Sequence, residues 1–131
     1  MKFIEKLLSK NSFKKLTSGE IGASGEDRAE KLLKKQGYII LERNYRVKCG
    51  EIDIIAKDGE YTCFVEVRLR KNSLYGSPAE SVDKYKQMKI IRAAKIYAMK
   101  HKLYDTPMRF DVVAIDCNDD SVEVIKDAFQ L

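Results

Sequence analysis

The hydrophobic and polar positions along the chain predict two long helices. Residues 17–36 begin with a capping-box pattern, in which Glu20 follows Thr17 by three residues, and then carry small and apolar residues at helical spacing. Gly37 follows as a stop signal. Residues 79–102 carry a second apolar stripe of helical period, so we expect the longer helix there.

Between and after these helices, β-branched and aromatic residues mark short strand segments. The Asp58-Gly59 dipeptide predicts a tight hairpin turn between two of them. The strand segments are residues 38–41, 45–47, 51–56, 61–70, 109–116 and 122–125. The order of helix, strands, helix, strands predicts a mixed β-sheet flanked by α-helices, which is an α/β fold.

Length and composition fit one soluble domain. The chain has 131 residues, of which 44% are hydrophobic, enough to bury a core. The formal net charge of +5 favours a polyanionic partner, either nucleic acid or an anionic membrane surface. No apolar run approaches the roughly 20 residues that span a bilayer. We expect a cytoplasmic domain over residues 17–131, preceded by a basic amphipathic arm over residues 1–16.

The cysteine and histidine content excludes several kinds of site. Cys49, Cys63 and Cys117 are an odd number without Cys-x-x-Cys spacing, so we expect reduced thiols and neither a disulfide framework nor a zinc site. His101 is the single histidine, and nothing around it suggests a catalytic triad. We interpret His101 as a residue at the end of a helix.

The predicted hairpin around Asp58-Gly59 brings acidic residues together. With this dipeptide at the tip, Lys57 pairs with Glu60, and counting back places Asp53 opposite Phe64. Asp53 and Glu66 are then diagonal neighbours on one face, roughly 7–8 Å apart at the backbone. The face carrying Asp53 and Glu66 also holds Phe64 and Arg68, while the other face of the second strand holds core residues, namely Cys63, Val65, Val67 and Leu69.

Two interpretations of this acidic face stay open from spacing alone. Two neighbouring carboxylates resist burial, and a divalent cation removes that cost, with Mg²⁺ or Mn²⁺ suiting the hard oxygen ligands. Alternatively, the face is solvated and Glu66 pairs with Arg68 or Arg70.

A wider set of motifs extends beyond the hairpin. In chain order these are Gly25-Glu26, Gly37-Tyr38, Arg43-Asn44-Tyr45-Arg46, Gly50-Glu51-Ile52-Asp53-Ile54-Ile55-Ala56, Phe64-Val65-Glu66-Val67-Arg68, Gly76 and Arg109-Phe110-Asp111-Val112-Val113. Together they resemble the YraN-like family of small bacterial proteins. That family resembles a branch of the PD-(D/E)XK nuclease superfamily, near the archaeal Holliday-junction resolvases. The resemblance covers about residues 19–117.

The resemblance implies a restriction-endonuclease-like fold and a metal-dependent DNA endonuclease. Asp53 matches the metal-binding aspartate of the superfamily, Glu66 its second acid, and Glu26 the helix-borne glutamate that resolvase-like members add to the metal site. Gln87 matches a polar position that often faces the site. Glu51 and Asp111 recur in the family pattern, and we interpret both as structural, with Asp111 in an ion pair with Arg109.

The chain departs from the superfamily pattern at Arg68, which occupies the position of the motif lysine. Arginine keeps its proton, so it cannot act as a base, but its planar fork can bind a phosphate. Lys48, Lys84 or Lys86 could replace the motif lysine.

Basic residues around the expected site predict a surface that binds the phosphate backbone of DNA. We expect the loop at residues 72–78 to touch the same backbone, with recognition by shape or branching rather than by base readout. The candidate nucleic-acid-binding residues are Arg46, Lys48, Arg70, Lys71, Lys84 and Lys86.

Three functions follow from these observations. The first is a Mg²⁺- or Mn²⁺-dependent endonuclease acting on branched or structured DNA, and relatives of resolvase type suggest a homodimer. The second is a non-catalytic nucleic-acid-binding module on a degenerate nuclease fold. The third is an adaptor or membrane-peripheral factor that works through residues 1–16.

Overall fold

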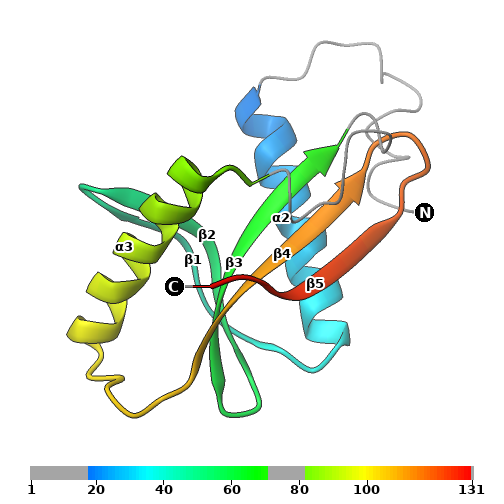
Figure 1. Cartoon of the computed structure of the whole chain (residues 1–131). Helices are drawn as coiled ribbons and strands as arrows, with labels where there is room; N and C mark the ends of the chain where they lie inside the picture. The colour runs from blue at the N-terminus through cyan, green and yellow to red at the C-terminus, as the bar shows by residue number, and fades with distance from the viewer. Residues whose placement is uncertain (1–17, 71–81, 131) are drawn as a thin grey trace.

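Among the residues that the structure describes, five strands form a single sheet in the order β1-β2-β3-β4-β5 (Figure 1). The computed structural model describes residues 18–70 and 82–130. The strands are β1 (Ile39–Val47), β2 (Gly50–Asp58), β3 (Tyr61–Arg70), β4 (Met108–Asp116) and β5 (Val122–Phe129). The pairs β1–β2, β2–β3 and β4–β5 are antiparallel, and β3–β4 is parallel. The mixed α/β sheet is therefore confirmed, and its arrangement is consistent with a restriction-endonuclease-like fold.

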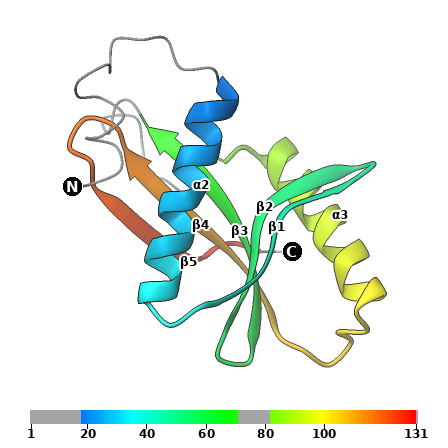
Figure 2. The same ribbon diagram turned by 180° about the vertical axis from the view of Figure 1, so that it is seen from behind.

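In the described part of the chain, one helix covers each face of this sheet. Helix α2 (Ser18–Lys35) lies behind the strands in Figure 1 and in front of them in Figure 2, whereas α3 (Lys84–Lys100) lies on the opposite side. Two separate apolar cores result. Ala29 and Leu33 of α2 pack with Ile54 in one, and Ile90 and Tyr97 of α3 pack on the other face of the sheet.

Strand β1 corrects the prediction of two short strands at residues 38–41 and 45–47. The chain stays in one strand from Ile39 to Val47 in spite of its polar middle. A β-bulge between Ile40 and Glu42 and a left-handed conformation at Asn44 (φ 53°) accommodate the polar residues. Sequence alternation could not show this, because a bulge changes the face to which later side chains point.

The second helix is shorter than predicted at its start. Asp83 is its N-cap and accepts a hydrogen bond from the backbone N–H of Lys86, so α3 begins at Lys84 rather than at residue 79. Residues 79–81 lie outside the described residues. At the other end His101 is the C-cap, and its Nδ1 lies 3.0 Å from the carbonyl oxygen of Tyr97, which confirms its interpretation as a helix-end residue.

The register of the β2–β3 hairpin differs from the predicted one by two residues. Asp58 pairs with Tyr61, so the tip is Gly59-Glu60 rather than Asp58-Gly59, and Ile55 rather than Asp53 lies opposite Phe64. A shift of two keeps every side chain on its predicted face, because side chains alternate with period two. The prediction that Cys63 and Val65 face a core is confirmed for this reason.

Strand β2 parts from β3 near Asp53. The pairing of β2 with β3 ends at Ile54 and Val65, whereas its pairing with β1 continues to Gly50. Ile54 packs in the core under α2, but Ile52 packs in the core under α3. The β1–β2 hairpin therefore turns toward α3 beyond Asp53, as Figure 1 shows.

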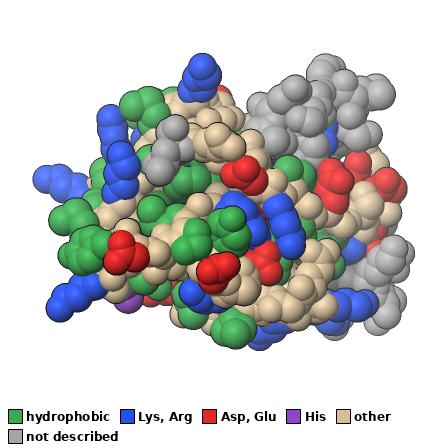
Figure 3. Space-filling model, turned by 60° about the horizontal axis from the view of Figure 1, so that its bottom comes forward, with side chains coloured by type: hydrophobic (Ala, Val, Ile, Leu, Met, Phe, Trp, Pro, Cys, Tyr) green, Lys and Arg blue, Asp and Glu red, His purple; other side chains and the backbone are tan. Residues whose placement is uncertain are grey.

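Seen from below, the molecule carries charges of both signs. Lysine and arginine side chains lie beside acidic ones near the middle of this face (Figure 3). In the part of the chain that the structure describes, no helix is long and apolar enough to cross a membrane. The predicted arm at residues 1–16, Lys71 and the loop at residues 72–78 lie outside the described residues.

Candidate active site

Asp53 occupies the point where β2 leaves β3. Its Oδ2 accepts a hydrogen bond of 2.8 Å from the backbone N–H of Val67, beyond the last paired residues of the two strands. A side-chain oxygen here satisfies a β3 backbone donor as the two strands separate. The carboxyl group of Asp53 is thus fixed at the fork between the strands.

Glu66 of β3 meets Asp53 at this fork. The Glu66 residue is only 3% exposed, so this face is not solvated as the alternative interpretation required. The pairing of Glu66 with Arg68 that the same interpretation predicted is present, at 3.8 Å. Burial, together with the charge of Glu66 and a hydrogen bond with its carboxyl group, raises the pKa of Asp53 to about 8. The Val67 N–H and the charge of Lys86 act in the opposite direction without cancelling this effect. The structure therefore brings the two predicted acids into contact.

Two cations lie near the buried carboxylate of Glu66. The ammonium of Lys86, from α3, lies 2.7 Å from Glu66 Oε2, and the guanidinium of Arg68 lies 3.8 Å from the same oxygen. Glu66 Oε2 nevertheless lacks a well-aligned hydrogen bond, so proximity of charge rather than a directed bond compensates it. Lys86 is one of the three lysines that the sequence offers as substitutes for the motif lysine.

Glu26 of α2 approaches the acid pair from the other side of the sheet. Its Oε1 lies 3.4 Å from a guanidinium nitrogen of Arg43, and it also has a hydrogen bond with the Asn44 side chain. Burial and the charge of Asp53 raise the pKa of Glu26, while Arg43 and Asn44 oppose this increase. Glu26 is therefore close enough for the charge of Asp53 to raise its pKa, but its contacts are with residues of β1.

Glycine at position 25 lets α2 approach the sheet at this point. A Cβ atom there would lie 3.3 Å from the side chain of Leu69 on β3, tighter than an ordinary contact. The Gly25-Glu26 pair thus combines a close approach of the helix with a carboxylate that faces the strands.

Gln87 lies one residue after Lys86 but makes a different contact. Its Nε2 donates a hydrogen bond of 2.8 Å to the carbonyl oxygen of Val82, just before α3 begins. In this structure Gln87 fastens the start of the helix, and no contact between it and the acid pair is seen among the described residues.

Asp53 and Glu66 are the residues at the fork that could hold a divalent ion. The carboxyl oxygens of Asp53 and Glu66, which include the buried Oε2 of Glu66 without an aligned hydrogen bond, form a hard donor set. Within residues 18–70 and 82–130, no group of three or more His, Cys, Asp or Glu side chains could hold a metal ion. Mg²⁺ in phosphoryl sites commonly takes one or two carboxylates and completes its shell with water and phosphate oxygens, which matches Asp53 and Glu66.

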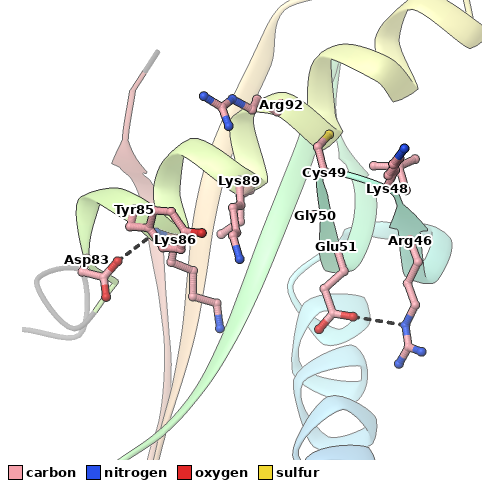
Figure 4. Close-up of a pocket in the computed structure, with 12 residues that line it drawn as sticks. Arg46, Lys48, Cys49, Gly50, Glu51, Asp83, Tyr85, Lys86, Lys89 and Arg92 are labelled. Carbon is pink, nitrogen blue, oxygen red and sulfur yellow. Dashed lines mark hydrogen bonds and ion pairs between the residues drawn. The ribbon is translucent and has the colours of Figure 1, made fainter.

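A basic groove of about 770 Å³ lies beside the acid pair, between the turn of the β1–β2 hairpin and the start of α3 (Figure 4). Lys86 lines the groove and also contacts Glu66 of the acid pair. The two acids of the groove are already engaged, because Glu51 pairs with Arg46 at 3.1 Å and Asp83 caps α3. The cations lining the basic groove are Arg46, Lys48, Lys86, Lys89 and Arg92.

The hairpin and the helix that line the basic groove approach each other closely at the backbone of Gly50. A Cβ atom at Gly50 would lie 2.6 Å from the carbonyl oxygen of Lys89, so only glycine permits this approach. Of the predicted nucleic-acid-binding residues, Arg46, Lys48 and Lys86 line the groove. Lys84 is exposed at the start of α3, and Arg70 ends β3, but neither lines it.

A second polar cluster surrounds Asp111 of β4, which is fully buried. Arg109 binds both carboxylate oxygens of Asp111 at 2.9 Å, and the hydroxyl of Tyr38 and the backbone N–H of Asp127 donate to them. The predicted ion pair between Arg109 and Asp111 is confirmed. Glu51 is likewise in an ion pair, with Arg46, rather than at the acid pair.

Asn44 is the site residue that sequence reasoning missed. It stands between the pairs Arg43–Ile54 and Tyr45–Ile52, which puts it across from Asp53, and its left-handed backbone marks the place where the hairpin bends. Its position inside the Arg43-Asn44 motif is a signal in the sequence, and asparagine tolerates this conformation better than most residues. The contact with Glu26, however, depends on how α2 packs.

Comparison with known proteins gives a consistent family. The family model described as "Uncharacterised protein family UPF0102" matches residues 25–115, which include Glu26, Asp53 and Glu66. A UPF0102 protein of Clostridium kluyveri is 51% identical over 116 residues, covering 86% of this chain and 95% of that protein. Those of Clostridium tetani and Geotalea uraniireducens are each 50% identical, covering 92% and 85% of this chain and 99% and 90% of their own lengths.

Proposed function

Because the chain belongs to the UPF0102 family, whose description assigns no activity, we propose a function from the chemistry of its own residues. The proposed function is a metal-dependent DNA endonuclease that hydrolyses phosphodiester bonds in branched or structured DNA. The observation that supports it best is the contact between the carboxyl groups of Asp53 and Glu66, buried at a fork between strands and adjoining a basic groove.

A purely structural acid pair is a poor explanation for this arrangement. Two neighbouring buried carboxyl groups destabilise the folded protein unless one is protonated or a cation neutralises them. The raised pKa of Asp53, about 8, indicates that the groups of the protein itself do not compensate the charge fully. Strongly perturbed acids beside a groove are typical of functional sites.

The residues divide the chemistry among them. Asp53 and Glu66 would hold the divalent ion, and the ion would supply a Lewis acid and a water of lowered pKa. Arg68, 3.8 Å from Glu66, carries a permanent positive charge that stabilises the charge developing on the phosphate. Glu26 contacts Arg43 and Asn44 in this structure. If those contacts were broken, its carboxylate could become a third ligand beside Asp53.

The basic groove supports a nucleic-acid substrate. Five cations on the hairpin and on α3 line it, and its acids are engaged in an ion pair or a helix cap. Such a groove attracts a phosphate backbone without regard to sequence. Tyr85, which is 69% exposed on the rim, offers a ring for an unpaired base, a feature that suits branched rather than uniform duplex DNA.

Cleavage of defined DNA forms tests this proposal. Four-way junctions, flaps, linear duplex and single strands are incubated with Mg²⁺ or Mn²⁺ and wild-type protein, Asp53→Asn or Asp58→Asn. Asp58 is the matched control, because it lies on the same strand but belongs to the other polar cluster. We expect nicking by the wild type and by Asp58→Asn, and loss of nicking but not of DNA binding in Asp53→Asn.

Failure of the wild type to cleave any of these forms with either ion would contradict the endonuclease. Salt-sensitive DNA binding that persists under those conditions would then identify the protein as a non-catalytic binding module. Cleavage that survives Asp53→Asn would equally contradict the proposed site.

A further inference from the structure

Lys86 connects the acid pair with the basic groove. Its ammonium lies 2.7 Å from Oε2 of Glu66, while its side chain is 45% exposed and lines the groove. Glu66 itself is 3% exposed. The charged end of Lys86 therefore has two environments within reach, a buried carboxylate on one side and a solvent-filled groove on the other.

The backbone of Lys86 is fixed, but its charged end can move. The N–H of Lys86 donates to the N-cap Asp83 at 2.8 Å, and the next residue, Gln87, binds the carbonyl oxygen of Val82. Both bonds anchor the first turn of α3. The ammonium sits at the end of a flexible four-carbon stem, so it can change partners without any movement of the helix.

A divalent ion at the acid pair would compete with this ammonium. Lys86 already occupies Oε2 of Glu66, the buried oxygen that lacks an aligned hydrogen bond. Two cations a few ångströms apart repel each other strongly in a half-buried site. The ammonium would thus leave Glu66 when the ion binds, and the exposed side of its stem faces the basic groove, as Figure 4 shows.

We infer that Lys86 is a catalytic cation with two positions: it neutralises Glu66 before a divalent ion binds, and it contacts the phosphate to be cleaved after the ion has displaced it. This inference rests on the proposed function and deepens it. The helix-borne lysine then supplies a mobile charge at a site where β3 carries Arg68 in place of a lysine. Arg68 is half-buried, with its charged end 3.8 Å from Glu66, and keeps its positive charge whether or not the ion is bound.

The chain offers a matched control for this role. Lys89 lies three residues further along α3, lines the same groove and has the same charge, and Figure 4 shows both side chains extending from the helix toward the strands. Its ammonium lies 4.6 Å from the centre of the Tyr85 ring rather than beside the acid pair. Lys89→Gln therefore removes a groove charge without changing the partner of Glu66.

The test combines two measurements on the same variants of the full chain. Mn²⁺ affinity is measured by titration calorimetry without DNA, and the cleavage rate of a junction is measured at saturating Mn²⁺. For Lys86→Gln we expect Mn²⁺ binding about tenfold tighter, because a competing charge is gone, and cleavage about 100-fold slower, because a cation at the phosphate is lost. Lys86→Arg should restore wild-type Mn²⁺ affinity and part of the rate.

For Lys89→Gln we expect unchanged Mn²⁺ affinity and weaker binding of DNA. A thermal melt of each variant confirms that it is folded. In Lys86→Gln, tighter Mn²⁺ binding combined with slower cleavage indicates a cation that the ion displaces. If Lys86 only stabilised the fold, its removal would leave Mn²⁺ affinity unchanged or weaker.

Unchanged or weaker Mn²⁺ binding in Lys86→Gln would overturn the inference, whatever the wild type cleaves. Tighter Mn²⁺ binding with an unchanged cleavage rate would overturn the contact with phosphate. A wild type that binds Mn²⁺ at Asp53 but cleaves no DNA would overturn the endonuclease and the catalytic role together. In that case, tighter binding in Lys86→Gln would still establish the displacement step.

Discussion

The two aspartates of β2, Asp53 and Asp58, lie five residues apart on one strand, and their pKa values move in opposite directions. Hydrogen bonding to Arg109 and to Lys126 lowers the pKa of Asp58, in spite of some burial. Burial and the neighbouring Glu66 raise the pKa of Asp53 to about 8. One strand therefore carries a carboxylate that the fold stabilises in its charged form and a carboxyl group that the fold destabilises in that form.

The surroundings of Asp58 form a nearly complete polar network. Arg109 lies 2.7 Å and Lys126 3.1 Å from its Oδ2, and Arg109 also binds Asp111 and the hydroxyl of Tyr38. Every charge in this cluster has an opposite charge or a donor within hydrogen-bonding distance. Satisfied networks of this kind rigidify a fold and have little capacity to bind anything further.

The surroundings of Asp53 are incomplete by comparison. In the described part of the chain, two neighbouring acids have cations at 2.7 Å and 3.8 Å from Glu66 only, and one oxygen of Glu66 has no aligned hydrogen bond. Both clusters look alike in sequence, since each combines acidic and basic residues on neighbouring strands. The balance of partners, rather than the presence of charged residues, therefore distinguishes a candidate active site from a structural ion pair.

The greatest loss of stability is expected at Asp111. Asp111→Ala removes a fully buried carboxylate and leaves Arg109, the Tyr38 hydroxyl and the Asp127 N–H without their acceptor. Breaking one side of a buried ion pair costs about 3–5 kcal/mol. We expect the free energy of unfolding in urea to fall by that amount. A loss under about 1 kcal/mol would show that the network around Asp58 and Asp111 is not the structural one.

At Asp53, by contrast, we expect a substitution to increase the free energy of unfolding. A raised pKa means that the folded state favours the protonated acid, so its stability falls as pH rises from the ordinary value of 3.8 through about 8. Near pH 9, Asp53→Asn should increase the free energy of unfolding by roughly 1–3 kcal/mol. Each tenfold difference in proton affinity between the folded and unfolded states contributes about 1.4 kcal/mol, and the substitution recovers part of the total.

Near pH 4 the same substitution should have little effect on stability, because Asp53 is then protonated in the folded state. Urea unfolding of the wild type and of Asp53→Asn at several pH values measures the difference. A wild-type stability that does not fall between pH 5 and pH 9 relative to Asp53→Asn would mean that the acid pair is balanced after all.

Divalent ions should separate the two clusters further. Mn²⁺ at about ten times its dissociation constant should stabilise the wild type by about 1.4 kcal/mol, seen as an increase in melting temperature. Asp58→Asn should respond as the wild type does, and Asp53→Asn should not respond. An equal response in all three proteins would place ion binding elsewhere.

Asp58 should give the weakest response to substitution. Its lowered pKa contributes stability above the ordinary value of 3.8, and this contribution is lost as pH falls through the lowered value. Because Asp58 is partly exposed and Arg109 keeps Asp111, Asp58→Asn should cost about 0.5–1 kcal/mol near pH 7. Urea unfolding near pH 7 and near pH 3 should show the cost shrinking at the lower value.

The sequence predicts much of this fold because its strongest signals are local. The stripe through Ala29 and Leu33, the alternation from Cys63 to Leu69 and the stop signal at Gly37 each depend on neighbours within a few positions. The predicted cap at Thr17 lies outside the described residues. The face shared by Asp53 and Glu66 was correct even with a wrong register, since an error of two residues preserves alternation. Local signals were therefore enough to place Asp53 and Glu66 on one face of the hairpin, but not to choose between the two interpretations of that face.

The parts that the sequence did not predict depend on contacts between distant segments. Whether Lys86 or another lysine reaches Glu66 depends on where α3 crosses the sheet, and the start of that helix at Lys84 was itself misplaced. The single strand through Asn44 requires a backbone conformation that the hydrophobic pattern does not encode. Position and charge of the groove follow from these same long-range contacts.

The contact at Gly50 determines the width of the basic groove independently of the charged side chains that line it. The hairpin and α3 meet backbone to backbone there, so the spacing between them is set by the main chain and not by the conformers of the lining lysines. Substitutions of the lysines and arginines around this contact should therefore change the charge of the basic groove but not its width. A methyl group at position 50 would instead push the hairpin away from α3 and widen the basic groove, with every charge unchanged.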